Sequence, residues 1–325
     1  MPAQIYTPTP ANLRRLARVL RHGGLVAMPT ETVYGLAAHA LDAKACRAIF
    51  RAKGRPANDP LIVHVTDLAH AEELAEFNDA ARRLARRFWP GPLTLVLPKK
   101  ACVPGIVTSD GPTVALRSPA HPLARRLLKL SSVPLAAPSA NPFSYISPTS
   151  AAHVQQGLGS RIDHILDGGV CPIGVESTVL DLTRPARPRI LRPGAISADQ
   201  LAGFLKTKVT TVRNAGKRGS HLLAPGLLDK HYSPRTPLRL MAHPGKPTDG
   251  TAIIHLRQPA GKSPVGVYWL SRRGALSEIA RNLYRVLREA DAGGHRAIVV
   301  EKLPPTAGGL AAAINDRLKR AAAKR

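Results

Sequence analysis

The sequence predicts an α/β protein with two domains: a large domain built on a twisted mixed sheet, followed by a small Rossmann-like domain. Short apolar runs of strand length are interspersed with segments of helical periodicity, without a strict βαβ repeat. Hydrophobic residues make up 44% of the 325 residues, which is enough for a substantial core. A basic segment without apolar periodicity, residues 210–235, is predicted to link domain 1–209 to domain 236–325.

Helix signals and apolar runs define the elements of the large domain. A first helix is predicted between Thr9-Pro10, a typical N-cap and first turn, and Gly23-Gly24, where the helix should end. Further helices are predicted over residues 43–52, 72–88, 122–130 and 198–206. Strands are predicted over residues 25–28, 61–65, 93–97, 113–117, 134–137, 162–167, 177–182 and 189–191.

The small domain should contain four short strands and two helices. The strands are predicted over residues 238–241, 252–256, 265–270 and 297–300, and the helices over residues 276–290 and 310–323. Only residues 243–250 join its first two strands, and this connection is too short for a crossover helix.

The composition limits the partners of the chain. A formal net charge of +26 favours contact with a polyanion, although a solvated, arginine-rich surface explains the charge equally well. Cys46, Cys102 and Cys171 form no Cys-x-x-Cys pair, so we expect no zinc site. Neither a signal-peptide pattern nor an apolar run of about 20 residues is present, which predicts a cytoplasmic protein without contact with a membrane.

Polar turns follow several of the predicted strands, and such turns are where open α/β sheets bind ligands. They lie at residues 30–32, 53–55, 139–141 and 174–178. Lys53 and Arg55 lie one residue apart beside the rigid Pro56, and two fixed cations suit a polyphosphate. The glycine-rich nucleotide-binding motifs are missing, so a nucleotide would be bound by a different set of residues.

These turns belong to an ordered set of motifs that resembles the YrdC-type threonylcarbamoyl-AMP synthases. The motifs are Pro-Thr-Glu-Thr-Val-Tyr-Gly-Leu at 29–36, Lys-x-Arg-Pro at 53–56, Pro-Leu-Ile-Val-His at 60–64, Trp-Pro-Gly-Pro-Leu-Thr at 89–94, Ala-Pro-Ser-Ala-Asn at 137–141, Gly-Val-Glu-Ser-Thr at 174–178 and Leu-Arg-Pro-Gly at 191–194. His-Tyr-Ser-Pro at 231–234 and Ile-Asn-Asp-Arg at 314–317 resemble the long form, which has an extra C-terminal domain.

The resemblance implies a fold, an activity and a set of partners. The fold would be a twisted sheet of YrdC type with a large basic groove. The enzyme would be a nucleotidyltransferase that forms threonylcarbamoyl-AMP and pyrophosphate from L-threonine, bicarbonate and ATP. The product would serve threonylcarbamoyladenosine modification of tRNA beside the anticodon, through a downstream threonylcarbamoyl-transferase machinery. Direct contact with tRNA and the oligomeric state stay open.

The resemblance also implies residue roles. Lys53 and Arg55 would be catalytic, because they could neutralise the leaving pyrophosphate. The expected ATP contacts are Lys53, Arg55, Asp59, Thr113, Ser139, Asn141, Ser147, Arg192 and Tyr232. The expected threonine contacts are Thr32, His64, Arg117, Ala137 and Ser177. No metal site made by the protein is expected, and Mg²⁺ should arrive with ATP.

Asp59 and segment 210–235 are the two further features of the site. Asp59 stands where the family often has asparagine, and a carboxylate near phosphates is unfavourable unless it meets a metal ion. Segment 210–235 is predicted to fold over the groove as a lid, with Gly216 and Gly219 as hinges and Tyr232 near the nucleotide. A passive tether is the alternative.

Two other functions fit parts of the sequence. The first is a non-catalytic protein of the same fold that binds double-stranded RNA or tRNA, as the net charge suggests. The hydroxyl-rich pocket residues favour the enzyme, because RNA binding does not require them. The second is an enzyme that handles carbamoyl-AMP, but the cysteine pairs and the acylphosphatase-like segment of hydrogenase-maturation relatives are not evident in the sequence.

Overall fold

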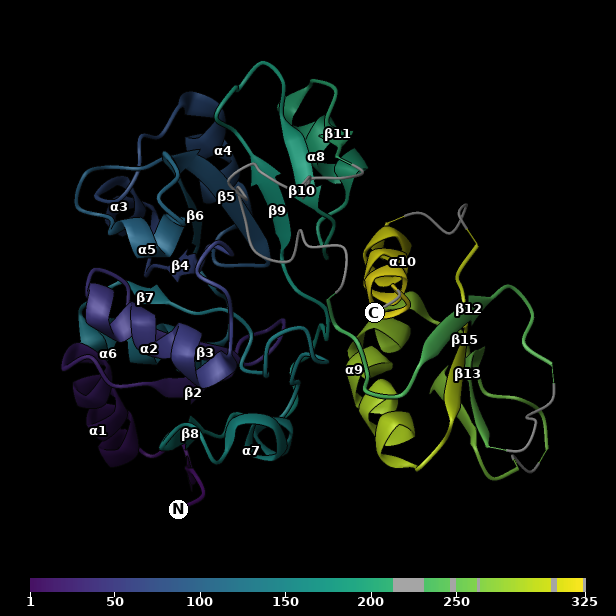
Figure 1. Cartoon of the computed structure of the whole chain (residues 1–325). Coiled ribbons are helices and arrows are strands. Elements are labelled where there is room, and N and C mark those ends of the chain that lie inside the picture. Colours follow the sequence, from purple (N-terminus) through teal and green to yellow (C-terminus); the bar gives the residue numbers. More distant parts are fainter. Residues whose placement is uncertain (213–230, 246–249, 262–263, 305–308, 324–325) are drawn as a thin grey trace.

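The computed structural model describes residues 1–212, 231–245, 250–261, 264–304 and 309–323. They form two bodies, the larger coloured purple to teal and the smaller green to yellow in Figure 1. The larger body contains a mixed sheet and the smaller a parallel one, so the predicted two-part α/β architecture is confirmed. Most of the predicted linker, residues 213–230 with Gly216 and Gly219, lies outside the described residues.

The large domain is built on one sheet. Its described strands are β1 (Gln4–Tyr6), β2 (Val26–Met28), β3 (Gly35–His39), β4 (Ile62–His64), β5 (Leu93–Pro98), β6 (Thr113–Arg117), β7 (Leu135–Ala136), β8 (His164–Leu166), β9 (Thr178–Asp181), β10 (Arg189–Arg192) and β11 (Thr210–Thr211). They are arranged in the order β1-β8-β2-β3-β7-β4-β6-β5-β9-β10-β11. Strands that are neighbours in space are often distant in sequence, which brings separate motifs together.

Helices cover the two faces of this sheet unequally. The described helices are α1 (Pro10–Arg21), α2 (Ala43–Lys53), α3 (Leu68–Glu72), α4 (Asp79–Phe88), α5 (Gly105–Thr108), α6 (Pro122–Ser131), α7 (Ala151–Leu158) and α8 (Ala198–Leu205). Helices α1 and α6 pack with β2, β3 and β7 in one apolar cluster. The same face carries only a small apolar cluster on the neighbouring strands β4, β6, β5, β9 and β10. Val212 packs against this cluster. This thinly covered part of the face leaves room for a pocket.

The local signals explain most element boundaries. Thr9 accepts a hydrogen bond from Asn12 N and Pro10 is the first residue of α1, as predicted. The prediction of one helix over residues 72–88 is wrong, because Asn78 caps a new helix at this point by accepting from Ala81 N. Strand β3 was missed because Gly-Leu-Ala-Ala-His has weak strand propensity, and its pairing with β2 and β7 stabilises it instead.

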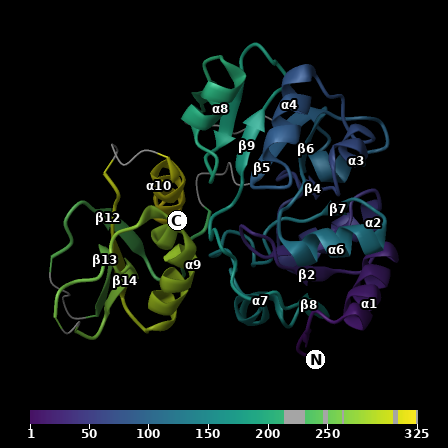
Figure 2. The ribbon, with the colours of Figure 1, turned by 180° about the vertical axis from the view of Figure 1, so that it is seen from behind.

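The small domain is a parallel sheet with helices on one side. Its described strands are β12 (Leu238–Met241), β13 (Thr251–Arg257), β14 (Val267–Ser271) and β15 (Ala297–Glu301), in the order β12-β15-β13-β14. Its described helices are α9 (Leu276–Ala292) and α10 (Leu310–Ala321). Both helices lie between their own sheet and the large domain in Figures 1 and 2.

The two domains share an apolar core. Val33, Ile146 and Val175 of the large domain belong to the same buried cluster as the inner faces of α9 and α10. Gly174 lies against the backbone of α9, where an added Cβ would be 2.5 Å from Ala280 O. The small domain is therefore packed directly beside the turn 174–178, one of the predicted ligand-binding turns.

Candidate functional site

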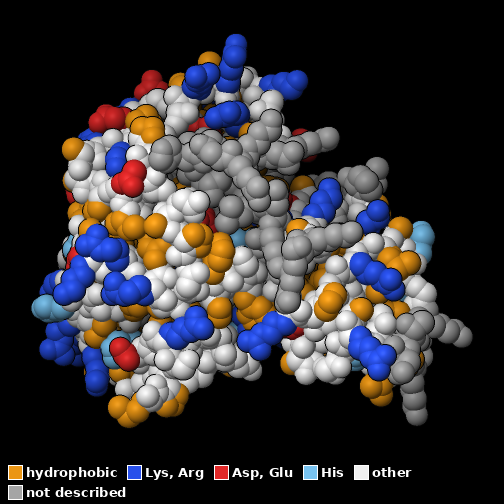
Figure 3. Space-filling model, in the orientation of Figure 1, with side chains coloured by type: hydrophobic (Ala, Val, Ile, Leu, Met, Phe, Trp, Pro, Cys, Tyr) orange, Lys and Arg blue, Asp and Glu red, His pale blue; other side chains and the backbone are white. Residues whose placement is uncertain are grey.

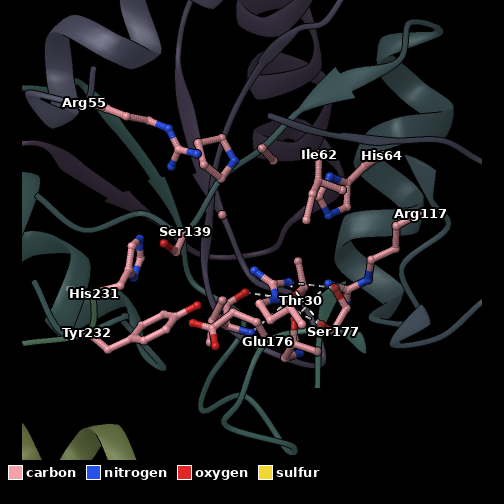
Figure 4. A pocket seen from close by; sticks show the side chains of 16 residues that line it. Thr30, Arg55, Ile62, His64, Arg117, Ser139, Glu176, Ser177, His231 and Tyr232 are labelled. Carbon is pink, nitrogen blue, oxygen red and sulfur yellow. Dashed lines mark hydrogen bonds between the residues drawn. The ribbon is translucent and has the colours of Figure 1, made fainter. Parts of the chain in front are cut away.

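The pocket lies on the thinly covered face of the large sheet and encloses about 490 Å³, including its mouth. It is lined by Thr30, Thr32, Val33, Gly35, Arg55, Ile62, His64, Arg117, Ala137, Pro138, Ser139, Glu176, Ser177, Arg192, His231 and Tyr232. All five expected threonine contacts are among them, together with four of the expected ATP contacts. Figure 4 shows Arg55 and Arg117 entering from opposite sides, with Tyr232 below Arg55.

Strand register brings the threonine side of the pocket together. β4 and β6 run parallel, and His64 pairs with Arg117 at their carboxyl ends. His64 also pairs with Leu135 of β7, which places the following Ala137 beside Ile62. Three motifs from distant parts of the sequence therefore meet at one edge of the thinly covered face.

Arg117 is held from three directions. Its Nη1 donates to Thr32 Oγ1 at 3.0 Å, its Nε donates to Gly91 O at 3.3 Å, and its Nη2 lies 2.7 Å from Glu31 Oε1. Burial would raise the pKa of Glu31, but the charge of Arg117 and its hydrogen bond outweigh burial and lower that pKa. The Glu31 carboxylate therefore stays charged and fixes the orientation of the guanidinium.

His64 is a neutral group beside this ion pair. Burial, and next the charge of Arg117, lower its pKa to about 3. Its Nδ1 is buried and has no hydrogen-bond partner in the part of the chain that the structure describes. A neutral imidazole that lines a pocket and has an unpaired nitrogen is suited to a ligand hydroxyl or amine.

Ser177 is fixed at the base of the pocket. Its Oγ lies 2.7 Å from Thr94 Oγ1 and accepts a hydrogen bond of 3.1 Å from Arg192 Nη2. Arg192 also donates to Ser177 O from Nε and Nη2. Ser177 is thus positioned by two large-domain side chains.

The two expected catalytic cations occupy different environments. Arg55 lines the pocket, where its Nη2 lies 2.9 Å from Asp59 Oδ1 and also donates to Pro60 O. Lys53 lies behind the pocket and donates to Ser139 O and Asn141 O at 2.6 and 2.5 Å. Burial, followed by the charge of Arg55, lowers the pKa of Lys53 well below its usual value. Lys53 thus supports the turn 139–141 from behind.

Other expected ATP contacts surround the pocket without lining it. Asp59 is buried against Arg55; burial raises its pKa, and the charges of Arg55 and Lys53 oppose this rise. Asn141 donates to Pro142 O and Tyr145 O, while its buried Oδ1 has no partner among the described residues. Ser147 Oγ donates to Glu176 Oε1 at 2.7 Å. Thr113 begins β6, on the same face as Arg117, and pairs with Pro98 of β5.

Sequence reasoning missed three charged or titratable groups of the site. Glu31 and Glu176 lie inside quoted motifs, but their arginine partners, Arg117 and Arg317, come from far along the chain. His231 lines the pocket next to Tyr232, and its buried Nδ1 has no partner within the described ranges. The sequence feature that could have identified His231 is its place in the His-Tyr-Ser-Pro motif, directly before Tyr232.

Neither a cluster of metal-ligating side chains nor a membrane-spanning helix occurs among the described residues. No group of three or more His, Cys, Asp or Glu side chains among them could hold a metal ion. The carboxylates nearest the pocket, Glu31, Asp59 and Glu176, are each paired with an arginine. Within the described ranges, no helix combines the length and the apolar character needed to cross a membrane.

Two family models together match nearly all of the chain. A family described as telomere recombination, Sua5/YciO/YrdC, matches residues 18–194. A second family, described as the C-terminal domain of threonylcarbamoyl-AMP synthase, matches residues 196–323. The chain belongs to the Sua5/YrdC family. Lys and Arg side chains outnumber acidic ones over the face of this family member seen in Figure 3.

Similar proteins extend over the full length of this Sua5/YrdC chain. The threonylcarbamoyl-AMP synthase of Pyrococcus abyssi is 42% identical, covering 96% of this chain and 94% of the relative. The threonylcarbamoyl-AMP synthase of Bacillus subtilis is 39% identical, covering 96% of this chain and 93% of the relative. The crystal structure of P. abyssi Sua5 complexed with L-threonine has a TM-score of 0.89 at 39% identity and covers 98% of both chains.

Proposed function

We propose that this pocket binds L-threonine, bicarbonate and ATP and that the protein is a threonylcarbamoyl-AMP synthase. The observation that carries the proposal is the meeting of Thr32, His64, Arg117, Ala137 and Ser177 with Arg55, Ser139, Arg192 and Tyr232 in one pocket. Full-length relatives of the same name and a threonine-bound homologue of the same fold support it.

The reaction class would be nucleotidyl transfer. Threonine and bicarbonate would combine to a carbamate with loss of water. A carbamate oxygen would then attack the α-phosphorus of ATP, forming the new P–O bond while the bond to the β-phosphate oxygen breaks and pyrophosphate leaves. Catalysis of such a step depends mainly on positioning and on neutralising the leaving group.

The two sides of the pocket suit different ligands. Around threonine, Arg117 would bind the carboxylate, and neutral His64, Thr32 and Ser177 would hydrogen-bond the amine and hydroxyl. Around ATP, Arg55, Ser139, Arg192 and Tyr232 would contact the phosphates and the nucleoside, with Lys53 supporting the turn that carries Ser139.

Mg²⁺ would enter with the nucleotide. The pocket carboxylates are paired with arginines, so the described residues do not form a magnesium site of their own. The same pairing offsets much of the positive charge of the pocket. A triphosphate therefore needs its own counter-ion, and the metal is expected on the phosphate oxygens.

The assay is release of pyrophosphate from ATP in the presence of bicarbonate. L-Threonine should support it, and L-serine should be poorer by roughly tenfold to a few hundredfold, because only a methyl contact is lost. L-Valine should be rejected more strongly, since buried polar groups would lose their partner. Equal rates with valine and threonine, or release without any amino acid, would refute the proposal.

Direct contact with tRNA is a separate question. Helices α1 and α6 pack together and carry Arg14, Arg15, Arg18, Arg21, Arg125, Arg126 and Lys129, with no acidic residue in either helix. We propose the basic surface of α1 and α6 as the place where the phosphate backbone of tRNA would bind. A cytoplasmic location would follow from the use of the product in tRNA modification.

A further inference from the structure

A buried ion pair joins the two domains at the wall of the pocket. Glu176 precedes Ser177 in the large domain, and Arg317 lies on α10 of the small domain. Arg317 Nε donates to Glu176 Oε2 at 2.7 Å, and the two side chains are 0% and 7% exposed. Because both charges are almost fully buried, the Glu176 carboxylate depends on Arg317 for its stability.

Further donors complete the surroundings of the Glu176 carboxylate. Ser147 Oγ donates to Oε1 at 2.7 Å, and the Tyr284 hydroxyl of α9 donates to Oε2 at 2.9 Å. Burial would raise the pKa of Glu176, but the charges of Arg317 and Arg192 and the hydrogen bonds lower it to about 2. A charged carboxylate of the large domain is thus bound by both helices of the small domain.

Arg317 reaches three parts of the pocket wall. Besides Glu176, its Nη1 donates to Pro193 O at 2.8 Å, directly after Arg192. Its guanidinium lies over the ring of Tyr232, 5.3 Å from the centroid. On the same ring, Tyr284 stacks with a centroid distance of 5.7 Å. The small domain therefore contacts the tyrosine of the pocket through an arginine and an aromatic ring.

Tyr232 needs this support. Its φ of 61° lies in the left-handed region, which a bulky residue adopts only when its surroundings impose it. Its side chain is buried, and its hydroxyl has no hydrogen-bond partner in the described part of the chain. Figure 4 shows that this hydroxyl points toward the centre of the pocket.

We propose that Arg317 is a positioning residue, through which the small domain holds the Tyr232 hydroxyl in place for the ligand that occupies the Arg55 side of the pocket. The proposal rests on the proposed function in taking that ligand to be ATP. Ser177 has hydrogen bonds of its own to Thr94 and Arg192, so the threonine side should depend less on Arg317 than the ATP side does.

The domains should stay docked without Arg317. Arg288 Nη2 of α9 donates to Ile146 O, and the Tyr145 hydroxyl donates to Asp291 Oδ2 at 2.8 Å. The shared apolar core also remains. Loss of Arg317 therefore changes the support of Tyr232 without separating the two domains.

The experiment compares four variants with the wild type: Arg317→Met, the double variant Glu176→Gln with Arg317→Met, Tyr232→Phe, and Arg285→Met as the matched control. Arg285 is a half-exposed arginine of α9 that pairs with Glu289. The binding of ATP and of L-threonine is measured by calorimetry, and the melting temperature is measured for each variant.

Arg317→Met should weaken ATP binding by about tenfold to a hundredfold and leave threonine binding within about threefold. The double variant should regain melting temperature, because the unpaired carboxylate is gone, but it should not regain ATP affinity. The control should match the wild type. If the double variant recovers both properties, or if Tyr232→Phe binds ATP like the wild type, the positioning role is refuted.

A readout without ATP separates this inference from the proposed function. The chain has only 6 tyrosines, so ¹³C-labelled tyrosine rings can be followed individually by NMR. The signal absent from Tyr232→Phe should shift or broaden in the double variant and stay unchanged in Arg285→Met. If the wild type binds no ATP but this shift occurs, the proposed function fails and the positioning role stands. An unchanged Tyr232 signal would refute the positioning role directly.

Discussion

Replacing Gly174 by alanine should loosen the contact between the two domains. Gly174 has a φ of +82°, and a Cβ at this position would lie 2.5 Å from both Ala280 O and Arg281 Cα. Both atoms belong to the backbone of α9, which cannot move aside as a flexible side chain can. Helix α9 would have to withdraw by about 1 Å to restore ordinary van der Waals contact.

Two effects contribute to the destabilisation by Gly174→Ala. Alanine in the left-handed region costs about 1 kcal/mol relative to glycine. A withdrawal of α9 would also stretch the bond from the Tyr284 hydroxyl to Glu176 Oε2, now 2.9 Å, beyond hydrogen-bonding distance. A hydrogen bond to a charged group contributes about 1.5–3 kcal/mol. The total destabilisation should therefore be about 3 kcal/mol.

Gly169→Ala provides the matched control. Gly169 also has a positive φ, +75°, but an added Cβ meets nothing within 4 Å. It should therefore incur the conformational cost of about 1 kcal/mol alone, without the collision.

The assay is thermal unfolding of both variants and the wild type, followed by calorimetry, together with pyrophosphate release. At roughly 2–4 °C per kcal/mol, Gly169→Ala should melt a few degrees below the wild type, and Gly174→Ala about 6–12 °C below it. Only Gly174→Ala should lose ATP affinity. Equal melting temperatures for the two variants would show that α9 does not press on Gly174, and would refute the reasoning.

Three further predictions concern the charged groups of the site. Arg117→Lys should weaken threonine binding about tenfold or more in calorimetry, since lysine cannot keep the contacts to Thr32 and Glu31 together. The surface substitution Arg189→Lys should have no effect. Equal threonine affinities for Arg117→Lys and the wild type would contradict the role given to Arg117. The pKa of Glu176 is about 2 in the folded chain, below its ordinary value of 4.5, so its contribution of about 3 kcal/mol to stability is present above pH 4.5 and is lost as the pH falls toward 2. The free energy of unfolding should therefore fall more steeply from pH 5 to pH 3 for the wild type than for Glu176→Gln. Parallel curves for the two proteins would argue against a charged, paired Glu176. Asp59→Asn should strengthen ATP binding in calorimetry, because it removes the carboxylate that now pairs with Arg55, and it should lower the melting temperature. Unchanged ATP affinity would mean that Asp59 only supports the turn.

The sequence alone determined the kind of fold and most of the pocket. Apolar runs and helix signals predicted the order of most elements, because periodicity and capping are local properties of the chain. The motifs predicted five residues as threonine contacts. These residues lie together in the pocket because each lies at or near the end of a strand of one sheet, or, for Ser177, directly before one. The prediction of one helix over 72–88 was wrong because Asn78 caps a separate helix. This N-cap signal is local, but the helical apolar pattern of the segment concealed it.

Only the tertiary structure decided which charges are paired and which domain completes the site. Lys53 and Arg55 look equivalent in the sequence, but one supports a turn from behind while the other lines the pocket beside Asp59. The Ile-Asn-Asp-Arg motif was predicted only as part of the second domain, and its Arg317 lies against Glu176, more than a hundred residues away in the sequence. Ion pairs and ring contacts of this kind depend on which strands and helices become neighbours. That choice is made by packing of the whole chain, so no local pattern could have shown it.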